Sequence, residues 1–324
     1  MTDTIHDTVM IGAGPSALAA AVYTTREDIG TILYEKGVVG GLAAITDLVD
    51  NYPGFPAGVR GLELAEQLQK QAERFGAKIE FGEAESIRDE GTHKTLIIDG
   101  AEVKAKTVLI ATGSDYNKLG IPGEAEFYGR GVHYCATCDG AYYREKRLVV
   151  VGGGNSAVQE SIFLTRYASH IDLLVRSTVK ASEVLQQDLQ KYVKEGKITV
   201  HLATTPQEIV AVDGKVAHVA ATKDGKETKF EIDGVFVFVG LKPNTQFLKD
   251  SGIELDKQGL VKTDQHLETT MKGVFASGDV RSGATMQIAS AVGEGATAAL
   301  AIREYLDNIP HHEAAASLED ARLY

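Results

Sequence analysis

The sequence has few cysteines, few basic residues relative to acidic ones and no long apolar run. Two cysteines among 324 residues cannot build a framework of disulfides. The 45 acidic and 33 basic side chains give a net charge of −12, which argues against a nucleic-acid partner because phosphate binding depends on clustered Lys and Arg. No apolar run approaches the ~18 residues that cross a bilayer, and residues 1–7 lack the basic and apolar regions of a secretory signal. We therefore expect a cytoplasmic protein without a nucleic-acid or membrane partner.

The length and an internal repeat both indicate two domains. At roughly 100–200 residues per domain, 324 residues suffice for two. Val9–Ala17, VMIGAGPSA, is matched by Val149–Ala157, VVVGGGNSA. Each copy continues into a helical stretch and then a second apolar run, Thr31–Tyr34 and Ile171–Val175. Strand, glycine-rich turn, helix and strand form the βαβ unit of a dinucleotide-binding fold.

The glycines of each G-x-G-x-x-A loop explain why such a loop binds a nucleotide. The first, Gly12 or Gly152, allows the tight turn, and the second, Gly14 or Gly154, lets the backbone approach a pyrophosphate. The helix N-terminus adds unpaired N–H groups and a partial positive charge. Pro15 suits the first helical position, where no N–H is needed. One such loop is a weak signal, but two in the same context are a strong one.

The order of the remaining predicted elements along the chain indicates that one domain is inserted in the other. The expected elements are an amphipathic helix over Gly61–Phe75, a hairpin around Asp99-Gly100, buried strands over Thr107–Gly113, Val235–Gly240 and Val274–Ala276, and a helix from about Gln287 to Tyr305. The last strand and helix have no equivalent in the second βαβ unit. We predict an α/β fold of two Rossmann-like dinucleotide-binding domains with the second inserted in the first. Residues 1–116 and 245–324 form one domain, residues 117–244 form the other, and residues 309–324 are a C-terminal extension.

The two cysteines lie together, in the run CATCDG. Structural zinc needs four ligands, and His133 beside Cys135 and Cys138 leaves one missing. Two buried thiols acting as small hydrophobes fit poorly beside Asp139 and Gly140. A redox pair needs one attacking and one resolving thiol, and an adjacent carboxylate can move the proton. Because a flavin passes two electrons between a hydride donor and a disulfide, the residues favour a flavin-dependent disulfide oxidoreductase.

The sequence resembles the low-molecular-weight thioredoxin reductases of bacteria and archaea over roughly residues 7–308. The matching motifs are the first G-x-G-x-x-A, Gly40-Gly41-Leu42, Asn51-Tyr52-Pro53-Gly54, Ala111-Thr112-Gly113, Cys135–Gly140, Gly152–Ala157 and Gly278-Asp279-Val280. The resemblance implies an enzyme with FAD in the first domain and a nicotinamide nucleotide in the second. It also implies a thioredoxin-like protein substrate, a homodimer, and rotation of one domain against the other.

The resemblance also assigns roles to individual residues. At the flavin it implies Gly12, Gly14, Pro15 and Ser16 for the pyrophosphate, Glu35 for the adenosine ribose, Gly41, Leu42 and Asn51 lining the flavin, Ala111, Thr112, Gly113 and Gly278 as further contacts, Asp279 for the ribityl or pyrophosphate region and Gln287 for the isoalloxazine edge. At the nicotinamide nucleotide it implies Gly152, Gly154, Ser156 and Arg176. Cys138 would face the flavin, Cys135 would attack the partner disulfide, and Asp139 would be the acid–base group.

One stretch departs from the family pattern. Members that use NADPH carry His-Arg-Arg and a further Arg four residues on, which hold the 2′-phosphate. The corresponding stretch, Val175–Lys180, retains one arginine, Arg176, and lysine cannot supply the bidentate fork of arginine. No acidic residue ends the strand, so NADH is not favoured either. Arg176 is then a phosphate contact or a solvated surface charge.

A second departure is the tail, HHEAAASLEDARLY, from His311 to Tyr324. A disordered polar end is the usual fate of a terminus. Related flavoenzymes that do not use pyridine nucleotides cover the flavin with C-terminal aromatic extensions. We therefore hypothesise that Tyr324 or His312 stacks on a flavin.

Three functions stay open at this point. The first is an NADPH-dependent thioredoxin reductase. The second is a disulfide reductase on the same scaffold fed by ferredoxin or a second flavin. The third is a redox-inert flavin-binding protein, which the intact CATCDG run opposes.

Overall fold

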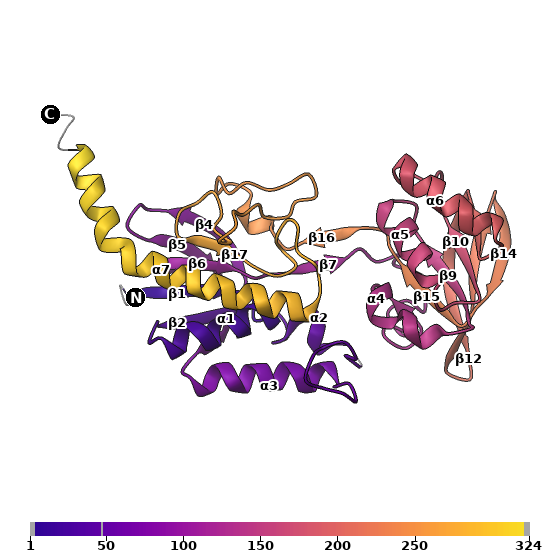
Figure 1. Ribbon diagram of the computed structural model, residues 1–324, viewed down its shortest axis with the longest axis horizontal. Helices are drawn as coiled ribbons and strands as arrows, with labels where there is room; N and C mark the ends of the chain where they lie inside the picture. The colour runs from indigo at the N-terminus through magenta and orange to yellow at the C-terminus, as the bar shows by residue number, and fades with distance from the viewer. Residues whose placement is uncertain (1–3, 47, 321–324) are drawn as a thin grey trace. The chain divides into compact units, whose positions relative to one another are not determined.

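The computed structural model describes residues 4–46 and 48–320, so Tyr324 lies outside the described residues. The chain divides into two compact units, Met1–Asp115 with Pro243–Tyr324, and Tyr116–Lys242. Two short strands, β7 (Ser114–Tyr116) and β16 (Leu241–Pro243), pair where the chain passes between the units (Figure 1). The predicted α/β class, with one nucleotide-binding fold inserted in another, is confirmed.

A seven-stranded sheet forms the centre of the first unit, in the order β3-β2-β1-β6-β5-β4 with β17 also on β6. The first half of β6 pairs with β5 in an antiparallel manner, through the predicted hairpin. The second half of β6 pairs with β17 in a parallel manner. The strands are β1 (Ile5–Ile11), β2 (Thr31–Glu35), β3 (Lys78–Phe81), β4 (Ala84–Asp89), β5 (Lys94–Ile98), β6 (Ala101–Ile110) and β17 (Val274–Ala276). Because β1, β2, β6 and β17 are parallel, their carboxyl ends meet at one edge of the sheet.

Helices cover one face of this sheet, and α1 packs directly against α7 (Figure 1). Alanines on α1 let the two helices approach so closely that a Cβ at Gly295 would collide with the Ser16 carbonyl oxygen. The helices of the unit are α1 (Pro15–Arg26), α2 (Gly41–Ala44), α3 (Gly61–Arg74), the short 3-10 turn η2 (Gln246–Leu248) and α7 (Ile288–Asp320). The opposite face is covered by η2 and the irregular chain that follows it, through Phe247, Leu248 and Val261.

Helix α7 is longer than the sequence suggested. The sequence predicted its end near Tyr305 and a polar tail beyond, whereas the helix runs on to Asp320. The segment Ala314-Ala315-Ala316 has high helix propensity, which accounts for the continuation. Among the described residues no helix is long and apolar enough to cross a membrane.

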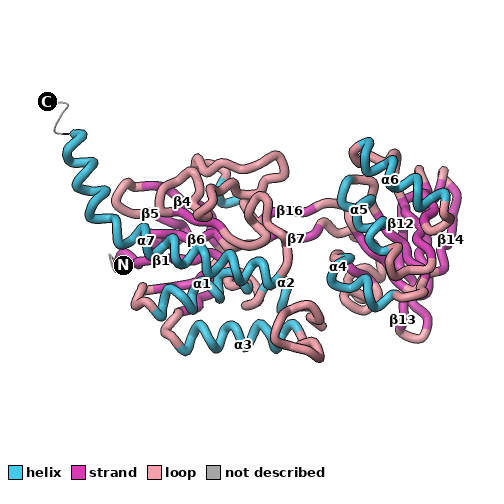
Figure 2. The backbone as a smooth tube through the Cα atoms, viewed as in Figure 1, coloured by secondary structure: helices cyan, strands magenta, loops and turns pink. Residues whose placement is uncertain are grey.

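The second unit is built on a five-stranded parallel sheet in the order β11-β10-β9-β15-β8. Its strands are β8 (Val132–His133), β9 (Arg147–Val151), β10 (His170–Leu174), β11 (Ile198–His201) and β15 (Gly234–Val237). One face carries α4 (Ala136–Asp139), the 3-10 turn η1 (Gly140–Tyr143), α5 (Asn155–Leu164) and α6 (Glu183–Lys194). The other carries an antiparallel sheet that the sequence did not predict, β12 (Thr204–Val212), β13 (Lys215–Lys223) and β14 (Lys226–Glu231), as Figure 2 shows.

Candidate active site

The first glycine loop joins β1 to α1 and leaves open space at the helix N-terminus. Gly12 has φ +96°, and a Cβ there would lie 2.5 Å from the Ala111 carbonyl oxygen, so only glycine fits. At Gly14, with φ −75°, no heavy atom lies within 4 Å of the position a Cβ would take. None of the described side chains caps α1, so its first N–H groups are available to an anion.

Two carboxylates at the same edge of the sheet suit the hydroxyl groups of a nucleotide. Buried Glu35, at the end of β2, accepts hydrogen bonds from the N–H groups of Ala13 and Gly37, each at 2.8 Å. Asp279 follows β17, and burial, helped by the charge of Glu294, raises the pKa of its carboxyl group to about 6. In the described part of the chain no side chain donates a hydrogen bond to that carboxyl group, so it is free to accept one from a bound ligand.

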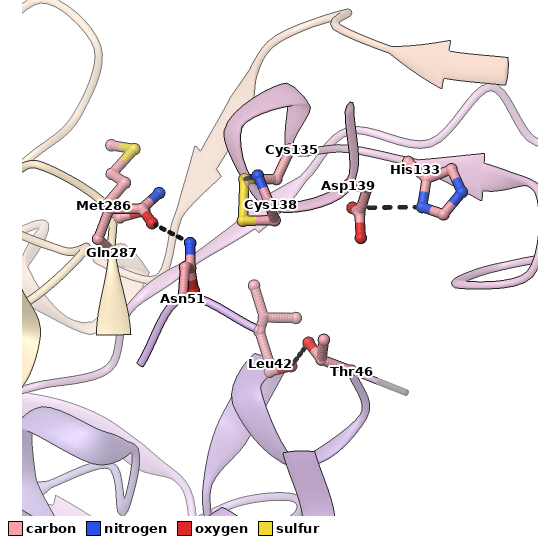
Figure 3. Close-up of a disulfide and its surroundings, with 9 residues drawn as sticks. All are labelled: Leu42, Thr46, Asn51, His133, Cys135, Cys138, Asp139, Met286 and Gln287. Carbon is pink, nitrogen blue, oxygen red and sulfur yellow. Dashed lines mark hydrogen bonds and ion pairs between the residues drawn. A yellow bond between two sulfur atoms is a disulfide. The ribbon is translucent and has the colours of Figure 1, made fainter. Parts of the chain in front are cut away.

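Other residues predicted at the flavin come together from distant segments. The Gly40 N–H donates to the Ala13 carbonyl at 2.8 Å, which ties the Gly40-Gly41 turn to the first loop. Asn51 Nδ2 donates to Gln287 Oε1 at 3.1 Å, a pair drawn in Figure 3 with Leu42. Two further predicted positions lie in the same unit: Ser16 Oγ lies 2.6 Å from Ser277 Oγ, next to Gly278.

The Ala111–Gly113 segment, also predicted at the cofactor, is held by the chain that returns from the second unit. Thr112 Oγ1 donates to the Asn244 carbonyl at 2.7 Å, and the Asn244 N–H donates to the Gly113 carbonyl at 3.1 Å. Gly113 has φ +65°. Both the backbone and the Thr112 hydroxyl therefore hold this segment against Asn244.

The second glycine loop, between β9 and α5, repeats the design of the first. Gly152 has φ +145°, and a Cβ there would collide with the Phe238 carbonyl oxygen. Gly154 has no heavy atom within 4 Å of a Cβ position, and Ser156 is exposed beside it. As in the first unit, the loop's first glycine donates to the end of the neighbouring strand, Gly12 to Tyr34 and Gly152 to Leu174. The second unit thus has its own dinucleotide-type loop.

Two cations stand beside this second loop. Arg176 and Lys180 are exposed and form no ion pair within the described residues. The Lys180 N–H donates to the Gly153 carbonyl at 2.6 Å, which fixes their segment against the loop. They are the only basic residues in the Val175–Lys180 stretch.

The two cysteines form a disulfide at the start of α4, with 5.3 Å between their Cα atoms (Figure 3). Cys135 is the N-cap residue of that helical turn, and its Sγ accepts the Cys138 N–H at 3.2 Å. Both residues are partly exposed. Among the described residues, no group of three or more His, Cys, Asp or Glu side chains could hold a metal ion.

The sequence did not identify the neighbour of Asp139. Asp139 Oδ2 lies 3.2 Å from Nδ1 of His133, a buried side chain on β8, and the pair is drawn in Figure 3. His133 Nε2 lies 2.6 Å from the Tyr143 hydroxyl. Asp139 ends α4 and Tyr143 ends the 3-10 turn η1 that follows, and no pattern in the sequence places His133 between them.

Known proteins match this chain over nearly its full length. The model of the pyridine nucleotide-disulphide oxidoreductase family matches residues 6–295. The thioredoxin reductase of Bacillus subtilis is 39% identical over 308 residues, 94% of this chain and 96% of that protein. The chain belongs to the thioredoxin reductase family. The crystal structure of the thioredoxin reductase from Streptococcus pyogenes superposes with a TM-score of 0.89 at 37% identity, covering 95% of this chain and 100% of that one.

Two further relatives agree with this assignment. The thioredoxin reductase of Treponema pallidum is 38% identical over 95% of this chain and 99% of its own. The Giardia duodenalis thioredoxin reductase structure has a TM-score of 0.88 at 29% identity over 94% of this chain and 100% of that one. As a member of the thioredoxin reductase family, the protein is an FAD-dependent disulfide oxidoreductase. The open space at Gly14, the Glu35 carboxylate and the Asp279 carboxyl group, which accepts no side-chain hydrogen bond from the described residues, fit FAD.

Proposed function

We propose that the protein reduces the disulfide of a thioredoxin-like protein, with FAD in the first unit and the Cys135–Cys138 pair as the carrier of electrons. The observation that supports this most is the disulfide between the chain's two cysteines, placed next to a carboxylate on one helical turn. A dithiol and disulfide exchange two electrons, as the reduction of one protein disulfide requires.

In this proposal the first unit binds FAD with residues from both of its chain segments, Met1–Asp115 and Pro243–Tyr324. The α1 N-terminus with Gly12, Gly14, Pro15 and Ser16 binds the pyrophosphate, and Glu35 binds the adenosine ribose. The remaining contacts are Gly41, Leu42, Asn51, Ala111, Thr112, Gly113, Gly278, Asp279 and Gln287. Bound FAD supplies two-electron chemistry between a hydride donor and a disulfide.

The reaction with the partner is thiol–disulfide exchange. The Cys135 thiolate attacks one sulfur of the partner disulfide, forming a mixed disulfide and releasing the other partner sulfur as a thiol. Cys138 then attacks Cys135 Sγ, which reforms the Cys135–Cys138 bond and frees the partner as a dithiol. The Cys138 N–H that points at Cys135 Sγ stabilises a thiolate there, which supports Cys135 as the attacking group. Asp139 serves as the acid–base group.

Two kinds of electron donor could reduce the flavin in this proposal. The second loop, with Gly152, Gly154 and Ser156 open at the α5 N-terminus, supports a nicotinamide nucleotide, and unpaired Arg176 supports a phosphate contact. The single arginine where NADPH-using members carry three favours a second candidate, a reductase fed by ferredoxin or another flavin. In that version Tyr324 or His312 of the tail covers the flavin. In either version we expect a cytoplasmic homodimer.

Anaerobic mixing of the oxidised FAD-loaded protein with NADPH and, separately, NADH distinguishes these donors. Rapid loss of flavin absorbance with either nucleotide, restored by oxidised thioredoxin, supports a nucleotide-dependent reductase. No loss with either nucleotide, but electron transfer to thioredoxin after chemical reduction, supports the second candidate. A chemically reduced protein that passes no electrons to thioredoxin contradicts the proposed substrate class. Cys135→Ser is the control, since it removes the attacking thiol.

A further inference from the structure

A buried histidine is bonded to the proposed acid–base group. We infer that His133 is the positioning residue of Asp139: its imidazole holds the carboxyl group and stores the proton that this group exchanges with the dithiol, and Tyr143 fixes the imidazole from the other side. The inference rests on the proposed function, because it needs Asp139 to act in thiol–disulfide exchange.

Packing leaves the His133 ring little freedom. The ring lies 5.1 Å from the Phe236 ring on β15 and 5.3 Å from the Tyr143 ring, which meets it edge-on at 72°. The side chain is only 6% exposed, against 20% for Asp139. Because β8 runs directly into the Cys135 turn, a fixed ring on β8 gives the Asp139 carboxyl group a fixed position relative to the cysteines.

Both nitrogens of the His133 ring have a hydrogen-bond partner, and one placement of the protons gives each hydrogen bond a donor and an acceptor. Burial, followed by the charges of Asp139 and Asp233, raises the pKa of Tyr143 above its usual range, so its hydroxyl keeps its proton. That hydroxyl can donate to His133 Nε2, at 2.6 Å. The ring proton then sits on Nδ1 and donates to the Asp139 carboxylate, at 3.2 Å. An added proton gives an imidazolium beside the carboxylate, with Tyr143 accepting from Nε2.

Among the described residues, His133 is the basic side chain that contacts Asp139. Tyr128 faces Asp139, and burial, helped by that carboxylate, raises the pKa of the Tyr128 hydroxyl. Asp233 acts on Tyr143 and pairs with Lys146. Over residues 4–46 and 48–320, no Lys or Arg forms an ion pair with Asp139. A proton on His133 therefore neutralises the carboxylate directly.

The relay balances the protons of the exchange. The relay starts with His133 as the imidazolium. Its Nδ1 proton passes to Asp139, and Asp139 protonates the first partner sulfur as that sulfur leaves, so His133 becomes a neutral imidazole. The Cys138 thiol returns a proton to Asp139 as its sulfur attacks Cys135 Sγ, and the pair regains its starting state. The second partner sulfur takes up from solvent the proton that Cys135 released when it became a thiolate. Two electrons pass from the dithiol to the partner, and two thiols replace its disulfide.

The test uses the FAD-loaded protein, reduced anaerobically and mixed with one of two disulfides in a stopped-flow apparatus. Oxidised thioredoxin releases alkyl thiolates, which need a proton, whereas 5,5′-dithiobis(2-nitrobenzoate) releases an aryl thiolate that leaves without one. The variant is His133→Phe, which keeps an aromatic ring between Tyr143 and Phe236. His201→Phe is the matched control, because His201 lies 2.8 Å from the Asp172 carboxylate and packs on Phe230 elsewhere in the same unit.

For His133→Phe we expect the rate with thioredoxin near neutral pH to fall by about 10–100-fold, part of what a positioned acid–base group contributes. The pH at which that rate is half-maximal moves lower, because an imidazole ordinarily holds its proton to higher pH than a carboxyl group. The rate of the first aryl thiolate release stays within about twofold, since that leaving group needs no proton and Cys138 has not yet given up its own. His201→Phe leaves both rates and the pH profile unchanged.

An unchanged pH profile with thioredoxin, or equal losses with both disulfides, would overturn the inference. If His133→Phe does not fold, Tyr143→Phe decides, because it keeps the ring packing and removes only the hydroxyl; a wild-type pH profile then counts against the relay. Failure of the proposed function looks different, since the reduced wild-type protein itself would then reduce no thioredoxin.

Discussion

Alanine substitutions of Gly12 and Gly14 are expected to separate the folding of the first loop from its binding of FAD. Gly12 has φ +96°, and its new Cβ would lie 2.5 Å from the Ala111 carbonyl oxygen, so the end of β6 must move. Backbone strain of this kind costs about 1–3 kcal/mol, and we expect Gly12→Ala to destabilise the apoprotein by about 2–4 kcal/mol once the collision is included.

Gly14→Ala is the matched change. Its φ of −75° suits any residue, and nothing lies within 4 Å of the new Cβ. The apoprotein should keep its stability or gain up to about 1 kcal/mol, because alanine narrows the unfolded ensemble. The same Cβ occupies the space that the pyrophosphate needs. We therefore expect Gly14→Ala to lower the affinity for FAD by about 100-fold. This loss would remove about 2.7 kcal/mol of the stabilisation that bound FAD gives to the folded protein.

Urea unfolding of the apoprotein and titration of FAD by its fluorescence measure the two effects separately. We expect Gly12→Ala to lower the urea midpoint. We expect Gly14→Ala to weaken FAD binding and to leave the urea midpoint unchanged or slightly higher. Wild-type FAD affinity in Gly14→Ala, or wild-type stability in Gly12→Ala, would refute the reasoning.

Three further predictions concern the same unit. Burial raises the pKa of Asp279 from 3.8 to about 6, so the stability of the folded state falls as the pH rises through this range. Asp279→Asn should therefore stabilise the apoprotein in urea by at most about 3 kcal/mol at pH 7.5 and by much less near pH 4. Arg281 and Glu294 pair at 18% and 14% exposure, and Arg281→Met should cost about 2 kcal/mol in urea unfolding. Adding Glu294→Leu should recover only part of this loss, because the Gly278 N–H donates to Glu294 Oε2 at 2.8 Å and would lose its acceptor. Deleting residues 311–324 should alter the flavin spectrum and its reduction rate if the tail covers the flavin, and leave both unchanged otherwise.

The βαβ units could be predicted from sequence because their signals are local. Each is an apolar run, a glycine turn and a helix within about 30 residues, and β1, β2, β9 and β10 formed where those runs lie. The glycine roles follow from sterics of the same kind, and Gly12 and Gly152 have the positive φ that a tight turn requires.

Contacts that depend on strand register or on ring packing could not be predicted. No partner for His201 could be predicted from the sequence, yet the parallel pairing of β10 with β11 brings His201 Nε2 to within 2.8 Å of Asp172 Oδ1. His133 was considered only as a zinc ligand, because nothing in one sequence shows that Phe236 and Tyr143 enclose it. The predicted end of α7 near Tyr305 is wrong, because the alanine-rich segment beyond it continues the helix to Asp320.

Counting the electrons that the protein accepts tests the central claim most directly. Under anaerobic titration with dithionite, the FAD-loaded wild type should take up two electron equivalents more than a variant carrying Cys135→Ser and Cys138→Ser, because a disulfide is a two-electron acceptor. The wild type should then return those electrons to oxidised thioredoxin, and the variant should not. Equal uptake by the two proteins, or equal reduction of thioredoxin, would contradict the assignment of this cysteine pair as the electron carrier.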